Sequence, residues 1–305
     1  MNSVVGLLRI KAAAVLLGPA GVGLIGLLTS LVGTASTLAG LGFGTAGTRQ
    51  IAEASAANDA RAVATARRAL FIGTLVLCSV GAAAIWGGRT ELALILLGDA
   101  SRSGQVGWLA IGVALSVAAA SQTAVLTGLR RTADIACVSV ASALFGTAVA
   151  VAGLLTWGDA GVVIFVLAMP FGSALAGYFY VARLPPAASH AIELKDLYAQ
   201  WRSLTALGAA FMAGGLVTTL GQLIVRSLVQ RELGLEALGY FQAAATLSMT
   251  YLGFVLAAMG ADYYPRLTAC INDPDAANRL INEQAELALL LAGPVLLTTM
   301  GLAPW

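Results

Sequence analysis

Long apolar runs recur along the chain and predict a protein built from membrane-spanning helices. A helix needs roughly 20 apolar residues to cross a bilayer core of about 30 Å. The runs are continuous rather than alternating, which favours helices over the strands of a membrane barrel. The first run is short and contains Arg9 and Lys11. The nine predicted spans are residues 3–17, 22–46, 69–86, 107–127, 135–157, 161–182, 204–229, 238–260 and 285–303.

The connections between these runs predict the domain organisation. Residues 49–71 have apolar positions three to four apart and are typical of one amphipathic helix at the membrane interface. Residues 92–99 are apolar but too short to span the membrane. Pro185 and Pro186 end the sixth helix, and another amphipathic segment follows. The sequence therefore predicts an N-terminal six-helix bundle (1–186), a cytoplasmic linker (187–203), and the first three helices of a second, related bundle (204–305).

Composition excludes several classes of protein. Of the 305 residues, 59% are hydrophobic and 10% are charged, and the mean hydropathy is +0.86. A soluble domain averages about 25% charged residues, so the excess apolar surface must face lipid. The net charge of +2 is too small to indicate nucleic-acid binding. Three scattered cysteines and a single histidine, His190, predict no disulfide framework, metal site or cofactor, and no nucleophile–base pair indicates an enzyme.

The distribution of Lys and Arg predicts the orientation in the membrane. Connections on one side hold eleven of these residues: Arg49, Arg61, Arg67, Arg68, Arg130, Arg131, Arg183, Lys195, Arg202, Arg266 and Arg279. Connections on the other side hold three: Arg89, Arg102 and Arg231. Cytoplasmic loops are enriched in positive charge. We therefore expect the eleven to be cytoplasmic, the N-terminus to be cytoplasmic, and the first run to act as a signal anchor.

The sequence also contains an internal repeat. A shift of 216 residues gives eight identities in 44 ungapped positions, among them Gly18 with Gly234, Gly23 with Gly239, and Gly44 with Gly260. The shift also aligns a tight turn, a span and a charged segment with their counterparts. Parallel repeats of six spans are a known transporter plan. Because the second copy holds only three spans, we expect a fragment or truncated variant of a protein with about twelve spans; an intact nine-span protein is the alternative.

Four segments carry a resemblance to a known family. They are KAAAVLLGPAGVGLIGLLTS (11–30), LAGLGFGTAGTRQIAE (38–53), LTGLRRTADIA (126–136) and ADYYPRLT (261–268). The chain resembles bacterial polysaccharide flippases, including O-antigen translocases, of the multidrug/oligosaccharidyl-lipid/polysaccharide exporter superfamily. The resemblance implies two six-helix bundles around a central cleft in the bacterial inner membrane. It also implies translocation of undecaprenyl-pyrophosphate-linked oligosaccharide by alternating access, for O-antigen (lipopolysaccharide) or related synthesis. Membrane lipids and polysaccharide polymerase machinery are the implied partners.

Such a substrate needs a polar groove with positive charge, because its sugar hydroxyls would otherwise lose their hydrogen bonds in hydrocarbon. Lys11 and Arg226, one from each repeat, are candidate pyrophosphate ligands, and Arg9 is a third. Ionisable residues inside spans normally face the protein interior or water. The alternative for Arg226 is an end-of-helix side chain that snorkels to the interface, and Arg9 has a similar alternative.

Further candidate residues lie at or near the ends of spans. Arg49 and Arg266 occupy nearly equivalent cytoplasmic positions and are candidates to capture pyrophosphate, or to close an inner gate with Glu53 or Asp262; ordinary positive-inside topology is the alternative. Gln222 and Gln242 are candidates to bind sugar hydroxyls, although such residues also join helices. Asp262 and Glu283 are candidate proton or cation sites, or simply solvated carboxylates. For the whole chain, the alternatives are a small-molecule antiporter of the same superfamily and a non-functional truncated scaffold.

Overall fold

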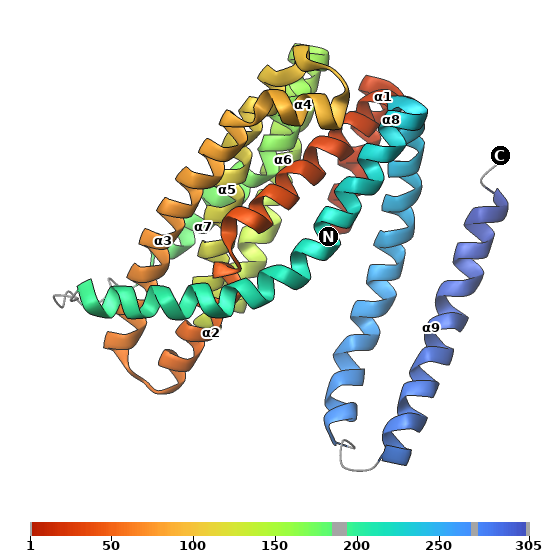
Figure 1. Cartoon of the computed structure of the whole chain (residues 1–305). Helices are drawn as coiled ribbons and strands as arrows, with labels where there is room; N and C mark the ends of the chain where they lie inside the picture. The colour runs from red at the N-terminus through yellow and green to blue at the C-terminus, as the bar shows by residue number, and fades with distance from the viewer. Residues whose placement is uncertain (1, 185–193, 270–273, 303–305) are drawn as a thin grey trace. The chain divides into compact units, whose positions relative to one another are not determined.

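The structure is a computed structural model that describes residues 2–184, 194–269 and 274–302 (Figure 1). Pro185, Pro186, His190 and the first part of the predicted linker lie outside these ranges. All regular structure in the described ranges is helical. The α-helices are α1 (Asn2–Gly40), α2 (Phe43–Ala56), α3 (Ala60–Gly87), α4 (Arg89–Leu97), α5 (Ser103–Gly128), α6 (Thr132–Trp157), α7 (Gly161–Ala182), α8 (Leu194–Ala269) and α9 (Pro274–Leu302). Short 3₁₀ turns occupy Ala100–Arg102 and Gly158–Ala160.

The predicted all-α membrane class is confirmed. The predicted apolar runs lie in helix over their described residues, except that the run 22–46 crosses a turn at Leu41 and Gly42 between α1 and α2. Within the described ranges, five helical stretches are long and apolar enough to cross a membrane: Val5–Gly40, Ala60–Gly87, Ala100–Gly128, Thr132–Ala182 and Gln200–Thr246. The first is broken at Gly18, the fourth contains the Gly158–Ala160 turn, and the fifth is broken at Gly234. The chain is therefore a multi-pass membrane protein.

The chain forms two compact units, Met1–Tyr240 and Phe241–Trp305. The first unit is a helix bundle with two apolar clusters in its interior. One cluster joins α1, α4, α5, α7 and α8 through side chains such as Leu27, Leu97, Leu109, Phe165 and Leu238; the other joins α2, α3, α5 and α8 through Phe43, Ile51, Leu70, Leu126 and Leu204. Large apolar side chains also cover the outside, as at Leu155, which is 66% exposed. Such a surface suits lipid contact.

The N-terminal part of α8 is anchored to this bundle by an aromatic side chain. Trp201 donates a hydrogen bond from Nε1 to the carbonyl oxygen of Ala69, at 3.0 Å. Its ring also meets Phe43 edge to face, with centroids 6.4 Å apart. Leu204, one turn further along, is fully buried. The end of the predicted linker is thus helical and packed, whereas the predicted division of the chain at residues 187–203 stays a prediction.

Two helices break at equivalent positions of the predicted repeat. Gly18 interrupts α1 with φ 68° and ψ −173°, and Gly234 interrupts α8 with φ 86° and ψ 174°. Positive φ is accessible to glycine at little cost. Pro19 follows the first break, at the opening position of a helix where its missing N–H costs nothing. The sequence repeat therefore has a structural counterpart, with the same backbone turn in each copy.

The two turns touch each other through small residues, in a contact that we call the glycine junction (Pro19, Gly23, Leu235 and Gly239). A Cβ atom added at Gly23 would collide with the carbonyl oxygen of Leu235, and one added at Gly239 would collide with that of Pro19. Pro19 and Leu235 are themselves 216 residues apart, as are Gly23 and Gly239. Each copy of the repeat thus makes the same contact with the other, as expected for two halves related by a pseudo-two-fold axis.

Below the glycine junction, α1 and α8 run side by side in opposite directions. Thr34 donates a hydrogen bond to the carbonyl oxygen of Thr219 at 3.1 Å. Further along, a Cβ atom added at Gly42 would collide with the carbonyl group of Gly208. Small residues let membrane helices approach closely, so these positions explain the Gly, Ser and Thr content of the two segments.

The segment 49–71 differs from its prediction. It is not one amphipathic helix, because the chain turns at Ala57–Asp59 between α2 and α3. Asn58 has a positive φ of 53°, and Asp59 caps α3 by accepting hydrogen bonds from the N–H groups of Arg61 and Ala62, both at 2.9 Å. Residues 92–97 form the end of α4, a nine-residue helix that is too short to span, as predicted, and Gly98 and Asp99 follow it.

The second unit contains the end of α8, from Phe241 onward, and α9. Leu280 and Ala292 of α9 are buried, whereas Leu289 and Leu297 are more than 70% exposed. Pro294 lies inside α9, where it removes one helical hydrogen bond. The exposed leucines give this unit an apolar surface that also suits lipid.

Candidate functional site

Lys11 lies at the surface of the first unit. It is exposed on α1, on the same face as Leu7, Leu8 and Val15, which are also exposed. It precedes the Gly18 turn by seven residues, which places it about 10 Å along the helix axis from that turn at 1.5 Å per residue.

Arg226 occupies the corresponding place in the second repeat. It precedes Gly234 by eight residues, or about 12 Å along α8. The side chain is half-buried, and its Nη1 donates to Gln222, 3.4 Å from the carbonyl oxygen and 3.3 Å from Oε1. The structure thus brings together two predicted site residues, Arg226 and Gln222. Because the two turns meet at the glycine junction, Lys11 and Arg226 lie at similar depths below it.

Arg9 points the other way from Lys11, into the interior of the bundle. Its guanidinium donates a hydrogen bond to the carbonyl oxygen of Phe165 and lies 4.2 Å from the centroid of the Phe165 ring. Successive residues rotate by about 100° around a helix, so Arg9 and Lys11 are about 200° apart. Arg9 does not share the Lys11 face.

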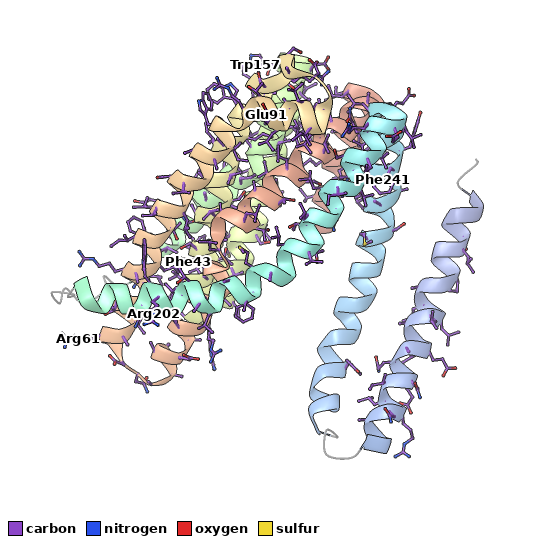
Figure 2. The ribbon with its side chains drawn as sticks, in the orientation of Figure 1. Phe43, Arg61, Glu91, Trp157, Arg202 and Phe241 are labelled. Carbon is purple, nitrogen blue, oxygen red and sulfur yellow. The ribbon has the colours of Figure 1, made fainter. Side chains whose placement is uncertain are left out.

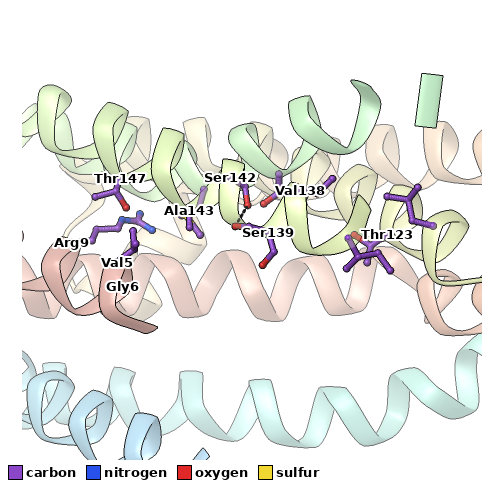
Figure 3. A pocket seen from close by; sticks show the side chains of 13 residues that line it. Val5, Gly6, Arg9, Thr123, Val138, Ser139, Ser142, Ala143 and Thr147 are labelled. Atoms are coloured by element: carbon purple, nitrogen blue, oxygen red, sulfur yellow. Dashed lines mark hydrogen bonds between the residues drawn. The ribbon is translucent and has the colours of Figure 1, made fainter. Parts of the chain in front are cut away.

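Arg9 lines a cavity of about 310 Å³ between α1, α5, α6 and α7 (Figure 3). Five hydroxyl side chains contribute to the wall, so the cavity is more polar than the apolar clusters beside it. The lining residues are Val5, Gly6, Arg9, Thr123, Leu126, Ile135, Val138, Ser139, Ser142, Ala143, Thr147, Met169 and Ser173.

The remaining predicted site residues lie elsewhere. Arg49 pairs with Glu53 one turn further along α2, with 2.7 Å between Nε and Oε1, and the predicted role of this pair in an inner gate stays a prediction. Both side chains are exposed, so the pair contributes little to stability. Gln242 donates to Thr246 Oγ1 at 3.2 Å, and Glu283 is exposed on α9. The side chains of Asp262 and Arg266 lie outside the described part of the structure.

Labelled side chains mark the two ends of the first unit. Figure 2 shows Glu91 and Trp157 at one end, and Arg61 and Arg202 at the other. The predicted cytoplasmic arginines Arg61 and Arg202 thus share an end, opposite the turn between α6 and α7. For these two arginines the structure agrees with the predicted alternation of loops, and the orientation in the membrane stays a prediction.

Residues 2–270 match a family described as polysaccharide biosynthesis protein. The chain belongs to this family. No curated protein sequence gives a significant match. A solved structure with the same fold is an inward-facing multidrug resistance MATE family transporter of the MOP superfamily, with a TM-score of 0.80 and 15% identity, covering 100% of this chain and 71% of that chain. At this identity the similarity shows the fold alone.

Membership of the polysaccharide biosynthesis family confirms the resemblance carried by the four segments. The sequence did not single out the hydroxyl residues around Arg9. Ser139 and Ser142 are three residues apart on α6, which is a visible spacing. However, hydroxyl residues are common in membrane helices, where they often bond only to their own backbone.

Proposed function

We propose that this protein translocates polyprenyl-pyrophosphate-linked oligosaccharide units across the bacterial cytoplasmic membrane. Its membership of the polysaccharide biosynthesis family supports the proposal. In polysaccharide synthesis, the substrate of a membrane transporter would be the oligosaccharide unit attached to its lipid carrier. On this proposal the N-terminus is cytoplasmic, and the substrate moves from the cytoplasmic to the outer leaflet.

Lys11 and Arg226 are the proposed ligands of the pyrophosphate. Their charges lie at similar depths below one junction, and each comes from a different copy of the repeat. Pyrophosphate carries two or more negative charges, so one cation from each half suits it better than a single residue. The polyprenyl tail stays in lipid beside the protein, since only the polar head requires shelter from hydrocarbon.

The glycine junction supports a mechanism of alternating access. Contact between the two turns closes one end of the path between the repeats, and separation of the turns opens it. Rigid repeats that rock around a central site are a general plan for transporters. Gln222 beside Arg226 is the proposed contact for sugar hydroxyls, as is Gln242. Arg49 and Arg266 are the proposed cytoplasmic capture residues, and Asp262 and Glu283 the proposed coupling residues.

Two alanine substitutions test the pyrophosphate ligands. When the substitutions are made in the chromosomal gene, Lys11→Ala and Arg226→Ala should each reduce surface polysaccharide by tenfold or more. A tenfold loss corresponds to the removal of about 1.4 kcal/mol of transition-state stabilisation. Polymer is measured on gels of cell-surface extracts, and membrane insertion by immunoblot. Arg231→Ala is the matched control, since Arg231 is exposed on the same helix as Arg226. Normal polymer in either test variant contradicts the assigned role.

A strain in which the gene is deleted distinguishes the translocase from the alternative function, a small-molecule antiporter. A small-molecule antiporter is supported only by the fold shared with the multidrug transporter. It would leave surface polysaccharide unchanged when the gene is deleted, and it would lower resistance to cationic drugs. A deletion strain that loses polymer but keeps its drug resistance supports the translocase.

A further inference from the structure

A half-buried cation points into the first unit, on the face of α1 opposite Lys11. Arg9 is half-buried between α1 and α7, and its Nε atom is buried without a hydrogen-bond partner in the described structure. Placing an arginine at the centre of a membrane helix costs about 2.5–3.5 kcal/mol on insertion scales. A residue that carries such a cost usually has a compensating interaction.

The cavity beside Arg9 supplies no negative charge of its own. Among the described residues that line it, none is acidic, and Arg9 is the single charged side chain. The Oγ1 atom of Thr147 is also buried without a partner in the described structure. Figure 3 shows Arg9 and Thr147 next to each other on facing helices. The Nε atom of Arg9 and the Oγ1 atom of Thr147, both without a partner in the described structure, thus belong to neighbouring side chains at one end of a cavity large enough for a small ligand.

We propose that this cavity binds a phosphate group, held by the Arg9 guanidinium and the Thr147 hydroxyl. Arginine presents planar pairs of N–H donors that match the oxygens of phosphate. The Phe165 carbonyl group and ring hold the guanidinium in one orientation, and its buried Nε–H group has no hydrogen-bond partner in the described structure. The hydroxyl groups of Ser139, Ser142 and Ser173 line the same cavity and suit the remaining phosphate oxygens.

The site is distinct from the pyrophosphate site proposed above. Arg9 and Lys11 lie on opposite faces of α1, and the cavity is lined by helices of the first repeat. The volume of about 310 Å³ exceeds that of a phosphate ion and leaves room for ordered water or for a small organic group. The phosphate group therefore has two sources, free phosphate in water and the headgroup of an anionic lipid.

Calorimetric titration of the purified full chain tests the site. Inorganic phosphate is titrated at constant ionic strength against protein in zwitterionic nanodiscs, and soluble phosphatidic acid in a parallel experiment. Binding of either probe to the unmodified chain is expected, and the stronger one identifies the source. Arg9→Gln should weaken binding tenfold or more, because it removes a charge-assisted hydrogen bond. Thr147→Val, which preserves shape, should weaken it about two- to tenfold.

Arg183→Gln is the matched control. Arg183 also stacks on an aromatic ring, 3.9 Å from the Phe179 centroid, but it is exposed and lies outside the cavity. Its substitution should leave binding unchanged. The proposal is overturned if neither probe binds, if Arg183→Gln weakens binding as much as Arg9→Gln, or if chloride binds as tightly as phosphate. Because Thr147→Val keeps the packing, its binding constant is informative even where Arg9→Gln fails to fold.

Discussion

At the scale of residues, hydroxyl groups join helices in the interior of the bundle. Thr74 of α3 and Ser121 of α5 are both buried, and a hydrogen bond of 2.7 Å joins their oxygens. Thr74 also donates to the Leu70 carbonyl oxygen at 2.7 Å, which leaves its Oγ1 atom free to accept the proton of the Ser121 hydroxyl. The interhelical bond is the part that ties α3 to α5.

Replacement of Thr74 by valine should destabilise the bundle by about 0.6–1.7 kcal/mol, the range measured for hydrogen bonds between membrane helices. Valine keeps the shape and removes the hydroxyl, so the loss reflects the bond rather than a cavity. Unfolding in mixed micelles with increasing SDS provides the measurement. Ser79→Ala on α3 is the control, because the Ser79 hydroxyl is exposed and bonds within its own helix; its effect should be within about 0.5 kcal/mol.

Residue contacts could be predicted from the sequence only where they are local. The Arg49–Glu53 pair follows from a spacing of four residues on one helix. Arg9 is different, because its partner Phe165 is 156 residues away. The rotation of α1 about its axis, which decides the face on which Arg9 lies, depends on how α7 packs against it. An apolar run with low amphipathicity contains no signal for that rotation.

At the scale of elements, the apolar runs predicted the helices well and some of their ends poorly. The predicted spans 135–157 and 161–182 match α6 and α7 closely. The predicted span 22–46 extends past the end of α1, because Leu41 and Gly42 adopt positive φ values of 45° and 66°. That turn lies against Gly208, a contact distant in sequence. The turn at Ala57–Asp59 did have a local signal, since Asn58 suits positive φ and Asp59 suits a helix N-cap.

The glycine junction makes a prediction at this scale. Gly239→Ala should separate the turns, because the added Cβ atom meets backbone at Pro19. A junction weakened by about 1 kcal/mol becomes roughly fivefold more open. Val22, which is 6% exposed next to the junction, is replaced by cysteine in a chain without its three native cysteines. Maleimide should then label Val22→Cys several-fold faster when Gly239→Ala is present.

Gly221→Ala supplies the comparison for this experiment. Gly221 also lies on α8, but a Cβ atom added there has no neighbour within 4 Å. Its substitution should leave the labelling rate at Val22→Cys unchanged. Equal rates for the two alanine variants would show that the Gly23–Gly239 contact does not control access at this end of the bundle.

At the scale of the whole molecule, the ends of the first unit differ in charge. The turn between α5 and α6 carries Arg130 and Arg131, whereas the turn between α6 and α7 carries Asp159 as its only charge. The α6 helix separates them by 26 residues, or about 39 Å, enough to cross a bilayer core. The positive-inside rule then orients the molecule, with the arginine turn in the cytoplasm.

This orientation can be measured with two single cysteines in a chain without native cysteines. Thr132→Cys and Asp159→Cys place one thiol at each end of α6, and both positions are exposed. A membrane-impermeant maleimide added to intact spheroplasts should label Asp159→Cys and not Thr132→Cys. In inverted vesicles the result should be reversed, because the other face is then accessible. The opposite pattern would place Arg130 and Arg131 outside, so that Lys11 and Arg226 would lie nearer the cytoplasmic end of the path. Labelling of both thiols from one face would exclude α6 as a membrane span.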